Sequence, residues 1–340
     1  MSEFKITSIT NRDGSHGPQV CGITTFGSSG VTLPSGPTEF RGGRGRGVVG
    51  GGHPGPQNTM DFVEIATIGN AQDFGDLTTG LRNIATCASS TRGTFAGGQT
   101  PSTTSAIMYV TISSSGGCNE FGNLSVAMTN SNDGCISDNT RGLIVLGSPS
   151  DIIQGNMESI IIPTTGNSNG FGELSVARRH TASMASPTRG VFAKGKNDAA
   201  GTYQRVIDFV TIQTGGTAVR FGETIESSEQ SVGTGNKTRG IIAGGLTAAP
   251  NTRSDTIEFF TLASEGNAQD FGNLGGSRIG CSSMSNSTRA LIAGGGTPTS
   301  QNNIEYITIA TTGNATDFGD LTRSNQVGQG LSDVHGGLAA

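Results

Sequence analysis

One repeated unit constrains the fold of this chain more than any other feature of its sequence. A Phe-Gly pair recurs six times at steps of 47 to 50 residues, and an arginine recurs in the same phase ahead of each pair. Self-similarity at such a period is typical of repeat architectures, in which one unit cannot bury its hydrophobic face alone. The markers are Phe74, Phe121, Phe171, Phe221, Phe271 and Phe318, with Arg46, Arg92, Arg141, Arg189, Arg239 and Arg289.

Each unit predicts four short strands. In the last unit, residues 288–295 form a short apolar run closed by two glycines, and residues 304–309 alternate and are rich in β-branched side chains. A Gly-Asn turn separates this run from residues 317–321, which carry the Phe-Gly pair. A weaker strand is expected around residues 279–284, ahead of the arginine. Four strands in about 48 residues match the blade of a β-propeller, so we predict an all-β propeller.

The glycine doublet that closes the apolar strand is also part of the unit. We expect its second glycine to meet a need for positive φ or for a close backbone approach. The first glycine is replaced by Leu146 and Lys194 in two units, so it is expected to be less demanding. The second glycines are Gly52, Gly98, Gly147, Gly195, Gly245 and Gly295.

An aromatic residue and an acid recur as well. The aromatic stands twelve residues before the phenylalanine in every unit except at Ser159, and the acid precedes it except at Met108. We predict an arginine–carboxylate pair on adjacent strands beside two packed rings; the alternative is a ring of charged binding sites. Repetition in nearly every unit favours the structural role. The residues are Phe62, Tyr109, Phe209, Phe259 and Tyr306, with Asp61, Glu158, Asp208, Glu258 and Glu305.

The repeat divides the chain into two parts. Residues 1–45 precede the first unit and are interpreted as an extended arm, and residues 46–340 as the propeller. Residues 327–333 begin like the strand before the arginine, which the first unit lacks, so we expect them to complete that blade and give six blades. A seven-blade alternative stays open, because Phe26 and His335 also stand in phase with the repeat markers.

Composition limits the function classes. Glycine is 55 of 340 residues, more than twice the usual share of roughly 7%, but the regular hydrophobic pattern after about residue 45 argues against disorder. The net charge is −5, without the basic stripe that nucleic acid requires, and the arginines between residues 41 and 46 are interpreted as an exposed linker. From this charge pattern we expect no nucleic-acid partner. No apolar run is long enough for a membrane span, so we expect no membrane insertion.

The residues that carry chemistry are scattered. The four histidines, at positions 16, 53, 180 and 335, lack metal-binding spacing. The five cysteines form no CxxC pair and are interpreted as reduced core residues. No GxSxG elbow, P-loop or Rossmann turn stands in the required context, and no acid pair lies outside the repeat. We therefore predict no catalytic residue, no cofactor, no metal and no enzymatic activity.

The most irregular unit runs from Arg189 to Arg220. It is the first candidate for a partner-binding loop because it breaks the symmetry of the repeat; the alternative is a variable surface loop. Its distinctive residues are Lys194, Lys196, Tyr203, Arg205 and Arg220.

Residues 256–295 resemble a kelch repeat of galactose-oxidase-type propellers. Phe259 stands at the family's tyrosine position, Phe271 at its tryptophan, Leu274 and Arg278 match its trailing pair, and Gly294 opens its glycine doublet. The resemblance covers about residues 46–335 and implies a propeller of four-stranded blades. The chain departs from the family in having no tryptophan, and its three tyrosines give no basis for copper oxidase chemistry.

A narrower resemblance concerns repeat proteins of marine bacteriophages, especially those of cyanobacteria. The pattern TRG-xx-AGG linked to TGNA-x-DFG-DL is similar to these repeats, and residues 6–36 are similar to leaders on phage virion proteins. The resemblance implies a virion component, such as a tail fibre or a capsid-surface protein. We expect homo-oligomers in the particle, with the propeller loops binding the host surface or neighbouring subunits.

Two alternatives are a capsid decoration protein without a receptor role and a lectin-like or polysaccharide-acting propeller. The arm is expected to pair with other virion proteins, or else to pack on its own propeller. The start of the chain has no charged segment followed by an apolar one, so we expect no signal peptide and synthesis in the host cytoplasm.

Overall fold

The structure is a computed structural model that describes residues 25–27, 30–32, 45–128, 134–147, 155–247 and 252–334. The chain divides into two compact units, Met1–Arg41 and Gly42–Ala340. In the first unit, β1 (Thr25–Gly27) pairs antiparallel with β2 (Gly30–Thr32). The described residues form strands and turns and contain no helix.

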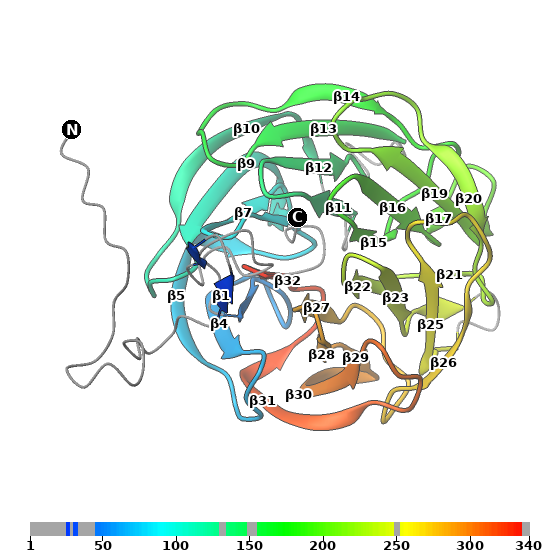
Figure 1. The fold of residues 1–340 in the computed structure, drawn as a ribbon. Helices are drawn as coiled ribbons and strands as arrows, with labels where there is room; N and C mark the ends of the chain where they lie inside the picture. Colours follow the sequence, from blue (N-terminus) through cyan, green and yellow to red (C-terminus); the bar gives the residue numbers. More distant parts are fainter. Residues whose placement is uncertain are drawn as a thin grey trace. The chain divides into compact units, whose positions relative to one another are not determined.

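The second unit is a six-bladed β-propeller of four-stranded antiparallel sheets (Figure 1). From the centre outward, the first blade consists of β32 (Gln329–Ser332), β3 (Arg46–Gly50), β4 (Gln57–Glu64) and β5 (Gln72–Leu81). The second blade consists of β6 (Ala85–Ala88), β7 (Arg92–Ala96), β9 (Ser102–Thr111) and β10 (Asn119–Met128). The third consists of β11 (Cys135–Ser137), β12 (Arg141–Val145), β13 (Asn156–Ile161) and β14 (Asn169–Glu173).

The last three blades repeat this order. The fourth blade consists of β15 (Ala182–Ala185), β16 (Arg189–Ala193), β19 (Val206–Thr211) and β20 (Val219–Glu223). The fifth consists of β22 (Val232–Gly235), β23 (Arg239–Ala243), β25 (Thr256–Thr261) and β26 (Gln269–Asn273). The sixth consists of β27 (Ser282–Ser285), β28 (Arg289–Ala293), β30 (Thr299–Thr308) and β31 (Thr316–Asn325). Short strands flank the blades: β8 (Gln99–Thr100), β17 (Lys196–Asn197), β18 (Thr202–Tyr203), β21 (Ser228–Glu229), β24 (Leu246–Thr247) and β29 (Gly296–Thr297).

The ring is closed by the C-terminal strand, as the repeat predicts. β32 pairs antiparallel with β3, with Gly47 opposite Ser332. The inner strands β6, β11, β15, β22, β27 and β32 contact one another in a complete circle. Six blades are thereby confirmed and the seven-blade alternative is excluded. Phe26 belongs to β1 of the other unit, and His335 lies outside the described residues.

The hydrophobic core lies between blades rather than within them. In one cluster, Phe74 from the first blade packs with Phe95 and Val110 from the second, and Leu331 of the closing strand joins them. Five similar clusters follow around the ring. Because a single four-stranded sheet cannot bury both faces, each blade removes its apolar surface from water only by packing against its neighbours.

The glycine doublets end the second strand of each blade. The second glycine has φ between 95° and 119° at Gly52, Gly98, Gly195, Gly245 and Gly295, which confirms the predicted need for positive φ. The first position is also left-handed in five blades, and Lys194 adopts φ 60° there despite its side chain, whereas Leu146 in the third blade does not have positive φ. The expectation that the first position is less demanding is therefore wrong for Lys194, whose side chain has a separate role described below.

Candidate functional site

The recurring arginine joins each blade to the next. In five blades its guanidinium lies over the recurring aromatic ring of its own blade, 4.2–4.8 Å from the centroid. Its Nη1 donates to a carbonyl in the following blade, as Arg239 does to Ile309 at 2.7 Å. Taken in chain order from Arg46, the carbonyls reached belong to Ile112, Ile162, Ile212, Leu262, Ile309 and Ile65.

The recurring aromatic also packs edge-to-face on the phenylalanine of the Phe-Gly pair. The ring centroids of Phe209 and Phe221 are 6.0 Å apart, and the other four pairs lie at 5.8–6.2 Å. The two packed rings predicted from the sequence are confirmed.

The predicted pairing of this arginine with the recurring acid is wrong. Successive residues of a strand point to opposite faces, so the acid faces away from the arginine that its aromatic neighbour contacts. The acid instead accepts hydrogen bonds from the preceding blade. Ser175 Oγ donates to Asp208 at 2.7 Å, and Thr322 Oγ1 donates to Asp61 at 2.6 Å. Glu158, Glu258 and Glu305 accept from the backbone N–H groups of Ser125, Ile225 and Gly275, at the equivalent place in the preceding blade.

Three of these acids also bind a buried cation. Arg178 Nη1 lies 2.8 Å from Asp208 Oδ2, with both side chains 0% exposed, and Arg278 pairs with Glu305. Burial lowers the pKa of Arg178, and Asp208 opposes that shift. Each arginine lies in the connection that enters the blade of its acid. Burying a charge is costly unless it is paired, so these pairs are structural elements of the blade junctions.

Lys194 supplies to the fifth blade the buried cation that an arginine supplies to the fourth and sixth blades. The connection into the fifth blade has Ser228 at the place of Arg178 and Arg278. Lys194, from the glycine doublet of the fourth blade, reaches Glu258 instead, with Nζ 2.8 Å from Oε1 and the lysine only 1% exposed. Lys194 is therefore a buried structural residue. The hypothesis that it belongs to a partner-binding loop is wrong for this residue.

The other residues of the irregular unit lie on the surface of the fourth blade. Lys196 in β17 pairs with Asp198 at 3.2 Å and lies 5.4 Å from the ring centroid of Tyr203 in β18. Arg205 Nε donates to the carbonyl of Thr224 at 2.8 Å. Arg220 lies further along the blade and pairs with Glu223. The structure thus brings Lys196, Tyr203 and Arg205 into one hairpin region and places Arg220 outside it.

His180 and Glu229 form a buried pair beside this hairpin. His180 Nδ1 lies 2.8 Å from Glu229 Oε2. Burial lowers the pKa of His180, although Glu229 opposes the shift. Burial alone would raise the pKa of Glu229, but His180, Arg179 and Lys196 together lower it. The geometry fits a neutral imidazole donating to a carboxylate, with Arg179 and Lys196 as the nearby cations.

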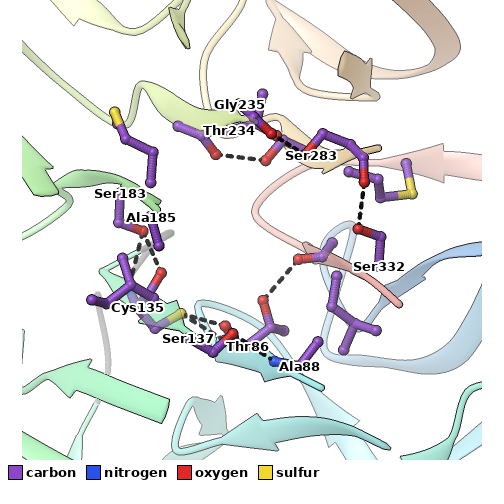
Figure 2. Close-up of a pocket in the computed structure, with 17 residues that line it drawn as sticks. Thr86, Ala88, Cys135, Ser137, Ser183, Ala185, Thr234, Gly235, Ser283 and Ser332 are labelled. Carbon is purple, nitrogen blue, oxygen red and sulfur yellow. Dashed lines mark hydrogen bonds between the residues drawn. The ribbon is translucent and has the colours of Figure 1, made fainter. Parts of the chain in front are cut away.

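A central cavity of about 70 Å³ lies within the six inner strands (Figure 2). Two layers of small residues line it, one residue per blade in each layer: Thr86, Cys135, Ser183, Gly233, Ser283 and Gly330, and then Ala88, Ser137, Ala185, Gly235, Ser285 and Ser332. Many of them bond from blade to blade, as Ser332 Oγ does to the Ser285 carbonyl at 2.6 Å. None of the lining residues is charged.

Sequence reasoning missed this cavity lining, although a signal was present. The inner strands show small residues at every second position, as in Ser282–Ser285 and Ala182–Ala185. The reason is steric: a side chain at Gly330 would overlap the carbonyl oxygen of Ser283 in the adjacent sixth blade. Six inner strands can approach the axis only when these positions are small.

Within the residues that the structure describes, no group of three His, Cys, Asp or Glu side chains could hold a metal ion. Burial raises the pKa of Cys281 to about 11 and that of Cys118 to about 12, so both thiols stay protonated at neutral pH. The described segments also contain no helix long and apolar enough to cross a membrane. Neither a family model nor a curated protein matches this chain.

The role of Lys194 as the buried cation beside Glu258 can be tested by substitution. Lys194→Gly would leave Glu258 buried without its cation, and we expect the free energy of unfolding to fall by about 3–5 kcal/mol. Adding Ser228→Arg to that variant should restore much of the loss, because Arg178 and Arg278 reach their acids from the same place. Urea unfolding followed by fluorescence or circular dichroism gives the comparison.

The control is Ser228→Arg in the wild-type background. There the new guanidinium would meet Lys194, so the same substitution should destabilise the protein. If Ser228→Arg had the same effect in both backgrounds, Lys194 would not be filling the place of the missing arginine.

The buried histidine predicts a pH dependence of stability. Because the folded-state pKa of His180 is below its unfolded value of about 6.5, protons bind the unfolded chain more readily. The contribution of His180 is therefore complete above about pH 6.5 and is lost as the pH falls below that value. Glu229 adds a second loss only below about pH 4.5.

Urea unfolding between pH 7.5 and pH 5 measures this slope. The variant His180→Asn, which places at this left-handed position the residue found at Asn83 in the second blade, should show a flatter slope than the wild type. Equal slopes would show that His180 titrates normally in the folded protein.

Proposed function

We propose that this protein is a non-catalytic structural protein of a bacteriophage virion, whose propeller binds a partner through loops that do not repeat. One observation carries the proposal. The recurring arginines and acids are held in bonds between blades, so they are not available as a ring of binding sites. What differs between blades is therefore the part free to specify a partner.

The blades differ from one another most in the connection between their second and third strands. These connections vary in length and sequence. The turns at the other end of the sheets vary less, with Thr-Arg in five units and Gly-Asn in four. Strands alternate in direction along a blade, so all of these connections lie at one end of the propeller. Loops on a rigid scaffold are the usual carriers of binding function.

The fourth blade supplies the best-defined surface among these connections. Arg205 and Ile225 are exposed and Tyr203 is half-buried, and Arg205 bonds to Thr224, the residue before Ile225. Ile225 is 42% exposed, at a place where the other blades have Thr, Ser or Gly. Aromatic and arginine side chains beside an exposed apolar residue are typical of contact sites between proteins.

The virion role rests on the resemblance of the repeats and of residues 6–36 to phage structural proteins. In this proposal residues 1–45 attach the protein to other virion proteins, and the fourth-blade surface faces the host cell or a neighbouring subunit. The central cavity supports a non-catalytic role, because its lining offers hydroxyls, small apolar groups and backbone but no charged group for acid–base chemistry.

A binding experiment tests this proposal. Purified full-length protein is incubated with whole cells of marine cyanobacterial strains and sedimented. We expect binding to a subset of strains, and a loss of tenfold or more for the combined variant Tyr203→Ala, Arg205→Ala and Ile225→Ser. The matched control is Ile68→Ser, which changes an exposed apolar residue at the other end of the propeller and should leave binding unchanged.

Antibody labelling of phage particles tests the virion role itself. Labelled particles without cell binding would favour capsid decoration, and cleavage of host polysaccharide would overturn the non-catalytic proposal. A protein lacking residues 1–40 should fold but be absent from particles. If the truncated protein were still incorporated, the proposed attachment through the arm would be wrong. If no particle carried the full-length protein, the proposed virion role would be wrong.

A further inference from the structure

The third blade lacks the aromatic ring that the other five blades place beside their arginine. Ser159 stands at the position of Phe62, Tyr109, Phe209, Phe259 and Tyr306. Arg141 is nevertheless held as in the other blades. Its Nη1 donates to the carbonyls of Ile212 at 2.9 Å and Gln213 at 3.1 Å. The guanidinium is therefore fixed in place for a ring that its own blade does not supply.

The missing ring leaves its neighbour uncovered. The phenylalanine of the Phe-Gly pair is 1–4% exposed in each of the other five blades, whereas Phe171 is only partly buried. In those blades the recurring aromatic packs edge-to-face on this phenylalanine. With Ser159 in that position, Phe171 has no such ring to pack against it, and its exposure is higher than that of its five equivalents.

A third residue makes the same place apolar. Ile161 lies opposite Arg141 in the register of β12 and β13, and it follows Ser159 by two positions, so both side chains are on one face of the sheet. Ile161 is 41% exposed. The equivalent residues in the other blades are Glu64, Thr111, Thr211, Thr261 and Thr308. The one blade without a ring is thus also the one that exposes an isoleucine beside the vacant position.

We propose that the notch formed by Arg141, Ser159, Ile161 and Phe171 binds an aromatic side chain of a protein partner. The inserted ring would lie under the Arg141 guanidinium and edge-on to Phe171, which completes the stack that the other five blades build from their own sequence. Ile161 would cover its outer edge. The five complete blades show which group this environment accepts: a phenylalanine or a tyrosine.

The notch suits a side chain better than a nucleotide. Arg141 directs Nη1 to two backbone carbonyls, and the chain carries a net charge of −5, so the notch offers little to a phosphate. It lies near the start of β12, away from the loop surface of the fourth blade, and it does not depend on a virion role. One protein could therefore hold two partners at once, one through each surface.

A minimal probe tests the notch directly. N-acetylphenylalaninamide is titrated into the full-length protein carrying labelled isoleucine methyl groups, with N-acetylalaninamide as the control ligand. We expect a saturable shift of the Ile161 methyl signal in the millimolar range with the aromatic probe alone. Ligand-observed saturation transfer gives the same affinity without relying on that methyl group.

Three variants decide the outcome. Ser159→Phe supplies the ring from within, so it should abolish probe binding while leaving the melting temperature unchanged or higher. Ile161→Thr, which introduces the residue of four other blades, should weaken binding at least threefold. Phe209→Ser should open an equivalent notch in the fourth blade and create a second site for the probe.

The proposal would be overturned by absence of probe binding, by binding that Ser159→Phe leaves intact, or by a lower melting temperature of Ser159→Phe. The last result would show that no space for a ring exists. None of these outcomes bears on binding to cells through Tyr203 and Arg205, so the two proposals fail independently.

Discussion

A propeller blade cannot bury its own faces, and in this chain one arginine per blade and, in five of the six blades, one carboxylate hold those faces against the neighbours. The arginine extends forward to a carbonyl of the next blade, as Arg239 does to Ile309. The acid, where present, receives bonds from the blade behind, as Asp208 does from Ser175. The two contacts act in opposite directions around the ring, so each blade is tied on both sides and the closing strand β32 completes the circuit.

This arrangement explains why the departures from the repeat are informative. In the fifth blade, where Ser228 stands at the place of Arg178 and Arg278, Lys194 supplies a cation to Glu258 from a different element. Where the acid is absent, Met108 Sδ lies 2.7 Å from Thr78 Oγ1 of the preceding blade. Where the ring is absent, at Ser159, the described residues of the third blade supply no replacement, and an isoleucine is exposed instead. In the fifth and second blades another contact from within the chain takes the place, whereas the vacant ring position of the third blade receives none from its own described residues, which points to a group from outside.

The sequence predicted the fold well because periodicity reports it directly. The Phe-Gly spacing set the size of a blade, and the likeness of residues 327–333 to an inner strand predicted the closure. Strand alternation places Asp208 and Phe209 on opposite faces, so the sequence itself argues against the arginine–acid pair. The carbonyl to which the arginine donates could not be predicted, because it lies in the next blade. Lys194 was misinterpreted for the same reason: its partner Glu258 lies in the next blade. The small residues at alternate positions of the inner strands are visible in the sequence. Their steric reason, the close approach of six strands around one axis, is evident only in the folded propeller.

The most direct test of these blade-to-blade links is hydrogen exchange on the variant Arg239→Gln. The account predicts faster amide exchange in two blades: around Phe259 in the fifth, where the guanidinium lies over the ring, and around Ile309 in the sixth, where its hydrogen bond ends. Faster exchange confined to the fifth blade, with residues 304–313 as protected as in the wild type, would contradict it. The recurring arginine would then stabilise only its own sheet.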